Sequence, residues 1–270
     1  MTLQRILALV FLLGVAACGG QADKPAPSTE RVIVTPVAAL TAAVPGESYP
    51  LLWQFDLADG WHLYWKGRND SGFPPSLKLT LPDGWRAGDL QWPAPERYLS
   101  AGDILDHVYH DQLTLLQDIT APATAVPGTE VTIPVRLDWL ICKDECVPGH
   151  TEVALKLRVA AQADFTPEAP RLAKALASVP VQVPQGSYEL TWGEASVTVK
   201  VPSAVKLAFF PDTDCGLLVD LIADGAADAE TLTLRFRAGP DGIGPVKGVL
   251  HQELPDGRTR NWLINQAFGG

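Results

Sequence analysis

Two cysteines with a short spacing are the residues of this chain whose chemistry stands out. Cys142 and Cys146 stand four positions apart between two strand-like stretches, so a disulfide between them would close a small loop at the end of a hairpin. Cross-linking so short a loop removes little chain entropy, which makes the bond a weak staple. Reactivity therefore explains the pair better than stability does, and the sequence predicts a redox pair.

The residues next to the pair have opposing effects on thiolate formation, and the sequence does not give the direction of their sum. Lys143 would favour a thiolate, whereas Asp144 and Glu145 would oppose one. His150 is either a local base or simply exposed. Two other interpretations stay open on the residues alone: a purely structural disulfide, and a site in which the two cysteines and His150 hold a soft ion such as Cu(I). Two thiolates and one distant histidine are too few for a closed zinc site, and we expect no metal and no cofactor.

The N-terminus has the pattern of an export signal. Arg5 precedes an apolar run over residues 6–17, which is shorter than the roughly 20 residues that span a bilayer and typical of a signal peptide. The run ends Val-Ala-Ala-Cys-Gly, which resembles the lipobox of bacterial lipoproteins. We expect residues 1–17 to be removed and Cys18 to carry the lipid, with an ordinary secretory signal as the alternative. Gly19, which is not aspartate, favours the outer membrane over the inner one.

Composition narrows the class of protein further. The chain has 270 residues and a formal net charge of −10, which is unfavourable for nucleic acid and for anionic lipid surfaces. We therefore expect no nucleic-acid partner and membrane attachment through the lipid only. Glycine and proline number 23 each and long helical patterns are scarce, which is typical of an all-β protein with many turns. The sequence contains no phosphate loop, nucleophile elbow or βαβ alternation.

Short strands separated by turn residues predict two β-sandwich domains. Residues 18–30 are expected to be a lipidated cysteine with a disordered tether. Residues 31–160 form the first predicted sandwich, residues 161–185 a linker with a short helix at 167–179, and residues 186–270 the second sandwich. The strands are predicted at 31–40, 51–57, 61–65, 77–81, 113–119, 131–141 and 151–159, and then at 188–192, 195–201, 206–210, 217–222, 231–237, 248–253 and 260–267.

Several motifs of the first sandwich resemble the N-terminal periplasmic domain of the DsbD-type thiol:disulfide interchange proteins. The resemblance is greater to the branch associated with suppression of copper sensitivity, and it continues through the second sandwich at Phe209–Asp212 and Gly248–Leu250. The motifs of the first sandwich are Gly60–Trp65, Asp70–Pro75, Gln91–Arg97, Tyr109–Leu113 and Asp138–Pro148.

The resemblance implies an immunoglobulin-like sandwich with the two cysteines on an exposed hairpin, shuttling between dithiol and disulfide through mixed disulfides with envelope proteins. It implies a periplasmic location in a Gram-negative cell. It also implies a cap loop over the pair, placed at residues 100–107, in which Asp103, Ile104 and Leu105 stand where the best-known branch has a shielding aromatic residue. Trp61, Tyr64 and Trp139 are expected to shape the surface beside the pair, together with Lys143 and His150.

Two further expectations concern electron supply and the remaining cysteine. Long members of the family continue into a membrane domain and a thioredoxin-like domain, and neither pattern occurs in this sequence. We therefore expect a separate partner, such as a membrane-embedded thioredoxin-type reductase, to exchange electrons with the pair. Cys215 has no partner nearby in the sequence, and a half-buried free thiol is its expected state, with an intermolecular disulfide as the alternative.

Overall fold

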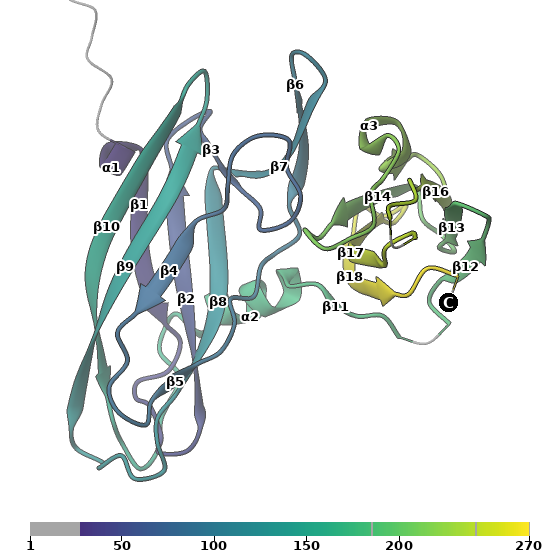
Figure 1. Cartoon of the computed structure of the whole chain (residues 1–270). Helices are drawn as coiled ribbons and strands as arrows, with labels where there is room; N and C mark the ends of the chain where they lie inside the picture. Colours follow the sequence, from purple (N-terminus) through teal and green to yellow (C-terminus); the bar gives the residue numbers. More distant parts are fainter. Residues whose placement is uncertain (1–27, 185, 241, 270) are drawn as a thin grey trace, which may run out of the picture.

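The protein is built almost entirely from antiparallel β-sheets (Figure 1). The structure is a computed structural model and describes residues 28–184, 186–240 and 242–269. The predicted signal peptide, Cys18 and most of the predicted tether lie outside the described residues. No helix in the described ranges has the length and apolar character needed to cross a membrane.

The first sandwich packs a four-stranded sheet against a six-stranded one. The four-stranded sheet has the order β1 (Val32–Ala38), β2 (Ser48–Leu57), β8 (Gln112–Thr120), β5 (Arg86–Ala87). The six-stranded sheet has the order β10 (Cys146–Arg158), β9 (Glu130–Cys142), β3 (His62–Tyr64), β7 (Ile104–His110), β6 (Glu96–Ser100), and β4 (Ser76–Leu79) pairs with β9.

Alternating apolar residues explain why these strands pack face to face. In β9, Ile133, Val135 and Leu137 point inward and are at most 2% exposed, while the residues between them face solvent. Trp53 of β2 and Trp139 of β9 are buried in the same core. The all-β sandwich fold predicted from the sequence is confirmed.

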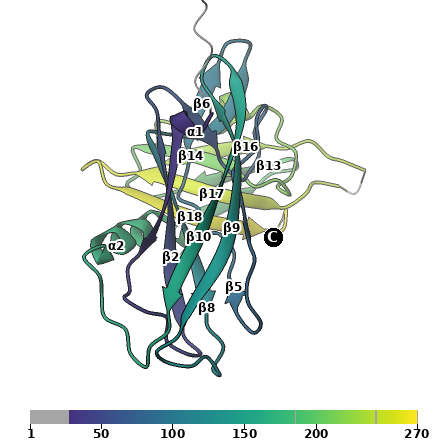
Figure 2. The same ribbon diagram turned by 90° about the vertical axis from the view of Figure 1, so that its left-hand side faces the viewer.

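The second sandwich is smaller and lies beside the edge of the first that carries β6 and β7 (Figure 1). Figure 2 shows its strands running across those of the first sandwich. Its five-stranded sheet has the order β11 (Val181–Gln182), β18 (Thr259–Gln266), β17 (Val246–Glu253), β14 (Lys206–Pro211), β15 (Ala226–Ala227), and its three-stranded sheet β12 (Glu189–Trp192), β13 (Ser196–Lys200), β16 (Thr231–Arg235).

Strand β14 contributes to the cores of both sandwiches. Leu207 and Phe209 point into the second sandwich, whereas Ala208 and Phe210 belong to the core cluster of the first. Because side chains alternate across a strand, one strand can serve two cores. Arg68 reinforces this junction by donating to the carbonyls of Cys215 and Gly216 at 2.6 and 3.2 Å. The two sandwiches are thus joined by apolar packing as well as by the chain.

In the part of the chain that the structure describes, three short helices accompany the sheets: α1 (Ser28–Arg31), α2 (Ala169–Ser178) and α3 (Leu221–Asp224). The predicted linker helix is present as α2, but its buried face consists of Leu172 and Ala175, while Leu176 is half exposed. The strand predicted at 217–222 is wrong. Asp220 caps α3 there by accepting a hydrogen bond from the Ala223 N–H at 2.9 Å, and a capped helical turn replaces the strand.

The segment expected to be a cap loop is mostly a strand. Residues 100–107 form the end of β6, a turn, and the first half of β7. Sequence periodicity did not predict β7 because both of its faces are covered. Asp106 is 3% and His107 0% exposed, so buried polar residues replace the usual alternation of apolar and polar ones.

Candidate redox site

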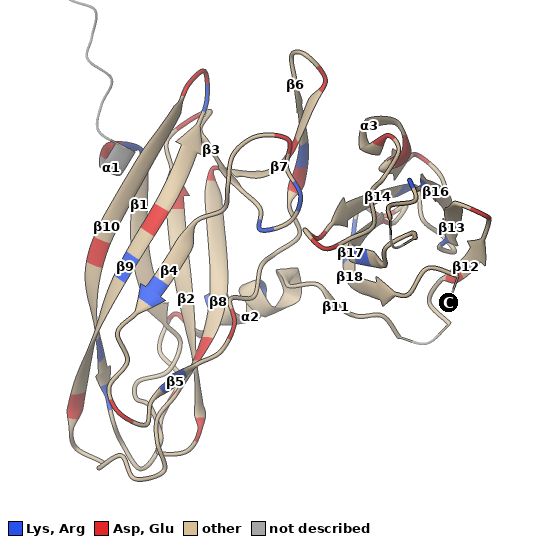
Figure 3. Ribbon diagram, viewed as in Figure 1, with Lys and Arg blue, Asp and Glu red and all other residues tan. Residues whose placement is uncertain are grey.

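A disulfide joins Cys142 and Cys146 at the tip of the hairpin formed by β9 and β10 (Figure 1). Cys142 is the last residue of β9 and Cys146 the first of β10, and the two are direct partners in the ladder with Cα atoms 4.1 Å apart. The three residues between them are exposed. Figure 3 shows charges of both signs at this tip. The two strands thus hold the sulfur atoms together at the end of the sandwich.

The two cysteines differ in their access to solvent. Cys142 is only 3% exposed and packs in a small cluster with Tyr64 and Val108, whereas Cys146 is exposed. His62 of β3 is the ladder partner of Cys142 on its other side. An incoming thiol can therefore approach Cys146 more easily than Cys142.

Tyr64 is the aromatic side chain that lies against the disulfide. Its hydroxyl oxygen is 3.8 Å from Cys146 Sγ, and the residue is 2% exposed. Gly72 lies against the ring so closely that a Cβ atom there would overlap the ring carbons of Tyr64. Burial raises the pKa of the Tyr64 hydroxyl, which therefore keeps its proton at neutral pH.

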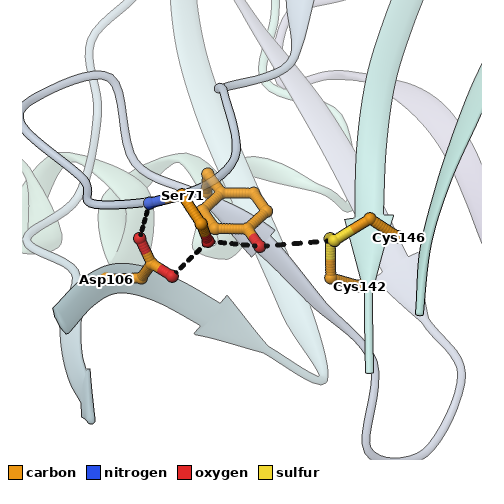
Figure 4. Close-up of a disulfide and its surroundings, with 5 residues drawn as sticks. Ser71, Asp106, Cys142 and Cys146 are labelled. Atoms are coloured by element: carbon orange, nitrogen blue, oxygen red, sulfur yellow. Dashed lines mark hydrogen bonds between the residues drawn. A yellow bond between two sulfur atoms is a disulfide. The ribbon is translucent and has the colours of Figure 1, made fainter. Parts of the chain in front are cut away.

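Ser71 and Asp106 extend the contact of Tyr64 away from the sulfur (Figure 4). The Tyr64 hydroxyl oxygen lies 3.3 Å from Ser71 Oγ. Ser71 donates to Asp106 twice, from Oγ at 2.6 Å and from its backbone N–H at 2.9 Å. The sequence predicted neither residue, because Ser71 stands in an apparent turn and Asp106 in the apparent cap loop. The signal in the sequence was the Asp70–Pro75 motif, which contains Ser71 but assigned it no role.

The segment from Lys66 to Gly72, which we name the strap, connects the second sandwich to this site. At one end Lys66 pairs with Asp212 at 2.9 Å. In the middle, Asn69 Oδ1 and Asp70 Oδ2 each accept a backbone N–H of β7 at 2.8 Å. At the other end Gly72 packs on Tyr64. The position of the Tyr64 ring therefore depends on contacts of the strap with both sandwiches.

Aromatic and imidazole rings surround the buried side of the pair. His62 lies between Tyr64, Tyr98 and His110, with ring centroids 4.9 to 5.6 Å apart. Burial lowers the pKa of His62 to about 4; the nearby His110 adds to the decrease and Asp106 opposes it. His62 is therefore neutral at physiological pH. Sequence reasoning placed His62 in a motif but gave it no role.

His107 makes the stability of the fold sensitive to acid. Burial lowers its pKa to about 4, even though its Nδ1 donates to the Arg68 carbonyl at 2.6 Å. The unfolded chain binds this proton near pH 6.5, so the contribution is complete above pH 6.5 and is lost as the pH falls to about 4. We expect the free energy of unfolding to decrease in this window by up to about 1.4 kcal/mol per pH unit.

Urea unfolding between pH 7 and pH 4.5 measures this dependence. His107→Asn keeps a donor for the Arg68 carbonyl but does not titrate, so its stability should change less over the window than that of the wild type. His150→Asn, at an exposed position, is the matched control and should follow the wild type. Equal pH dependence in all three proteins would contradict the assignment to His107.

The other residues predicted to shape the site are dispersed around the hairpin. Trp61 stacks under Arg31 at 4.2 Å, and Lys143 Nζ donates to the Asp59 carbonyl at 3.2 Å. Trp139 is a core residue, 2% exposed, and packs edge-on against Phe55 rather than against the pair. His150 is exposed in β10, opposite Asp138.

The three residues predicted to cap the pair lie at the β6–β7 turn. Asp103 has φ 57° in this turn, Ile104 is 38% exposed, and the Leu105 N–H donates to Asp70. Within the described ranges, the hydroxyl that reaches the disulfide comes from Tyr64. A capping role of the three turn residues stays a prediction.

Cys215 is a free thiol in the second sandwich. It is 4% exposed, more deeply buried than predicted, and burial raises the pKa of its thiol. Among the residues that the structure describes, no three histidine, cysteine, aspartate or glutamate side chains gather as a metal site.

Comparisons with known proteins agree with this geometry. Residues 30–158 match the protein family described as "Thiol:disulfide interchange protein DsbD, N-terminal". The N-terminal periplasmic domain of ScsB from Proteus mirabilis is similar in structure at 17% identity, with a TM-score of 0.58 over 91% of this chain and 97% of that one. The N-terminal domain of Neisseria meningitidis DsbD in the reduced form has 15% identity and a TM-score of 0.34, over 52% and 94%. No curated protein sequence gives a significant match.

Proposed function

We propose that this chain exchanges disulfides with other proteins of a Gram-negative periplasm through Cys142 and Cys146, and the match of residues 30–158 to the family of DsbD N-terminal domains supports this. The observation that carries the proposal is the disulfide at the hairpin tip, with one buried and one exposed cysteine. A buried partner and an accessible sulfur suit the two successive steps of thiol-disulfide exchange.

The difference in exposure assigns a role to each cysteine. A thiolate of the partner attacks Sγ of Cys146, the bond to Cys142 breaks, and Cys142 leaves as a thiolate that takes up a proton. The second thiol of the partner loses its proton and attacks the partner's own sulfur in the mixed disulfide, which releases Cys146. The partner loses two electrons and the pair becomes a dithiol; the reverse sequence passes the electrons on.

Location and partner are parts of the same proposal. A lipid on Cys18 would keep the protein at the periplasmic face of a membrane, the outer one by the rule for Gly19. A membrane-embedded reductase of the thioredoxin type would exchange electrons with the pair. The division at residues 161–185 into a sandwich that carries the pair and a second sandwich is likewise proposed, and the separate core cluster of the second sandwich supports it.

Trapping of mixed disulfides tests the roles of the two cysteines. Cys142→Ser removes the cysteine that resolves the mixed disulfide. The Cys146 thiolate of this variant should therefore attack disulfides of envelope proteins, release one of their two sulfurs as a thiol, and stay joined to the other in a covalent complex. Cys146→Ser should capture at least tenfold less, because its remaining thiol is buried. Non-reducing gels and mass spectrometry measure the complexes, and Cys215→Ala is the control that should behave as the wild type.

A redox titration separates this function from that of a binding module with a structural disulfide. An exchanging pair should have a reduction potential above about −300 mV, whereas a structural disulfide lies below it. A potential below that value, together with no complex from either cysteine variant, would reject the proposed exchange.

A further inference from the structure

The hydrogen bonds around Tyr64 have a direction, and Asp106 sets it (Figure 4). A carboxylate only accepts hydrogen bonds, so both Ser71 donors point toward Asp106. The Ser71 hydroxyl has then used its proton, and its oxygen is left to accept. The Tyr64 hydroxyl can donate to Ser71 Oγ at 3.3 Å or to the disulfide sulfur at 3.8 Å, which carries no proton. Because the hydroxyl oxygen is nearer and sulfur is a weak acceptor, the proton points to Ser71 and a lone pair faces Cys146 Sγ.

We propose that Asp106, Ser71 and Tyr64 act as positioning residues that hold reduced Cys146 as a thiol and so restrain its reactivity. This inference rests on the proposed function, because it concerns the reduced form of the same pair. The lone pair of Tyr64 can accept a hydrogen bond from a Cys146 S–H, but it repels a thiolate. Tyr64 could turn its proton toward a thiolate only by giving up its hydrogen bond to Ser71, and that loss favours the thiol.

Other titratable and charged groups also lie near the pair. None of them takes part in the hydrogen bonds that connect Asp106, Ser71 and Tyr64. All of them are unchanged in the variants at position 71 or 106. They are His62 of β3, Tyr98 of β6, His110 of β7, Arg31 of α1 and the three charged residues between the cysteines.

Two substitutions interrupt this chain of hydrogen bonds in different ways. Ser71→Ala changes no charge but removes the acceptor of Tyr64, whose proton can then point to a Cys146 thiolate. Asp106→Asn offers an N–H to Ser71, so the whole chain can reverse. Both variants should increase the alkylation rate of reduced Cys146 by iodoacetamide at pH 7 about tenfold and move the midpoint of its pH profile downward, because a thiolate that accepts a hydrogen bond is favoured.

The sequence allows the three thiols to be followed separately. Trypsin cleaves after Lys143, so Cys142 and Cys146 fall in different peptides of the reduced, alkylated protein. Buried Cys215 serves as an internal reference, since its alkylation rate should not change if the variants are folded. Asp144→Asn removes one negative charge next to Cys146 without touching the chain, and it should give a smaller increase than Asp106→Asn.

The results decide between the hydrogen-bond chain and simpler causes. An unchanged profile of Cys146 in Ser71→Ala would overturn the inference, and so would equal effects of Asp106→Asn and Asp144→Asn with no effect of Ser71→Ala. The proposed function is judged separately, by trapping and by the reduction potential of the wild type. If Cys146 exchanges normally but has the same alkylation profile in all variants, the proposed role of the hydrogen bonds is rejected and the proposed function still stands.

Discussion

Gly72→Ala is expected to uncover the disulfide. Position 72 has φ 39°, and a Cβ atom there would overlap the ring of Tyr64. The ring must move, or the strap must lift from it, and either change increases the exposure of Cys146. We expect reduction by dithiothreitol to become about tenfold faster, because Cys146 is exposed but its Sγ lies against the Tyr64 hydroxyl, and the rate of exchange depends on access to the attacked sulfur. Stopped reactions with an alkylating agent measure this rate.

Gly102→Ala is the matched control for the backbone conformation. Gly102 has φ 86° in the β6–β7 turn, and its Cβ atom would have no neighbour within 4 Å. Both variants place alanine in the left-handed region, which costs about 1 kcal/mol of stability, but only Gly72→Ala disturbs Tyr64. If both variants are reduced at the rate of the wild type, Tyr64 does not limit access to the disulfide.

Trp65→Ala should cause the largest loss of stability among these variants. Trp65 is 0% exposed and lies edge-on to His107 at 5.8 Å and to Phe210 of the second sandwich at 6.2 Å. Removing the ring leaves a cavity between the two sandwiches, beside the start of the strap. We expect the free energy of unfolding to fall by about 3–5 kcal/mol, the usual range for a buried tryptophan. Urea unfolding followed by circular dichroism measures it.

Trp192 is a control that separates the effect of losing a ring at the junction of the two sandwiches from the effect of losing any tryptophan ring. Trp192 is partly exposed and packs against Phe268 at 5.1 Å within the second sandwich. Because less of its surface is buried, Trp192→Ala should cost less than Trp65→Ala. A loss of under about 1 kcal/mol for Trp65→Ala would mean that the sandwiches are held together by other contacts.

The strands of the first sandwich that have one solvent face were predictable from the sequence. In β9 the alternation of Ile133, Val135 and Leu137 with exposed residues is the pattern that period-2 reasoning detects. The cysteine pair was found because its spacing fits a hairpin end. These features are local, so a single sequence carries them.

The features that the sequence did not predict depend on contacts between distant segments. Strand β7 is covered by the strap and by the second sandwich, so His107 and Asp106 look like loop residues although they are buried. Ser71 and Asp106 are 35 positions apart, and only the folded sheet brings them together beside Tyr64. The strand predicted at 217–222 is absent for a different reason: the Asp220 side chain caps a helical turn within an apolar stretch.

The place where the chain enters the fold has a consequence for geometry at a membrane. Helix α1 lies against the start of β10 (Figure 1), with Arg31 3.9 Å from Glu145, the neighbour of Cys146. Nine residues lie between Cys18 and Ser28, and a fully extended chain spans at most about 35 Å from one to the other. With the proposed lipid on Cys18, the chain would enter the fold at the disulfide end, which would stay within this distance of the bilayer. Confinement to so small a volume corresponds to a local concentration in the millimolar range for any partner within reach. Weak binding between the two proteins would then suffice for disulfide exchange, and a longer tether would slow the exchange.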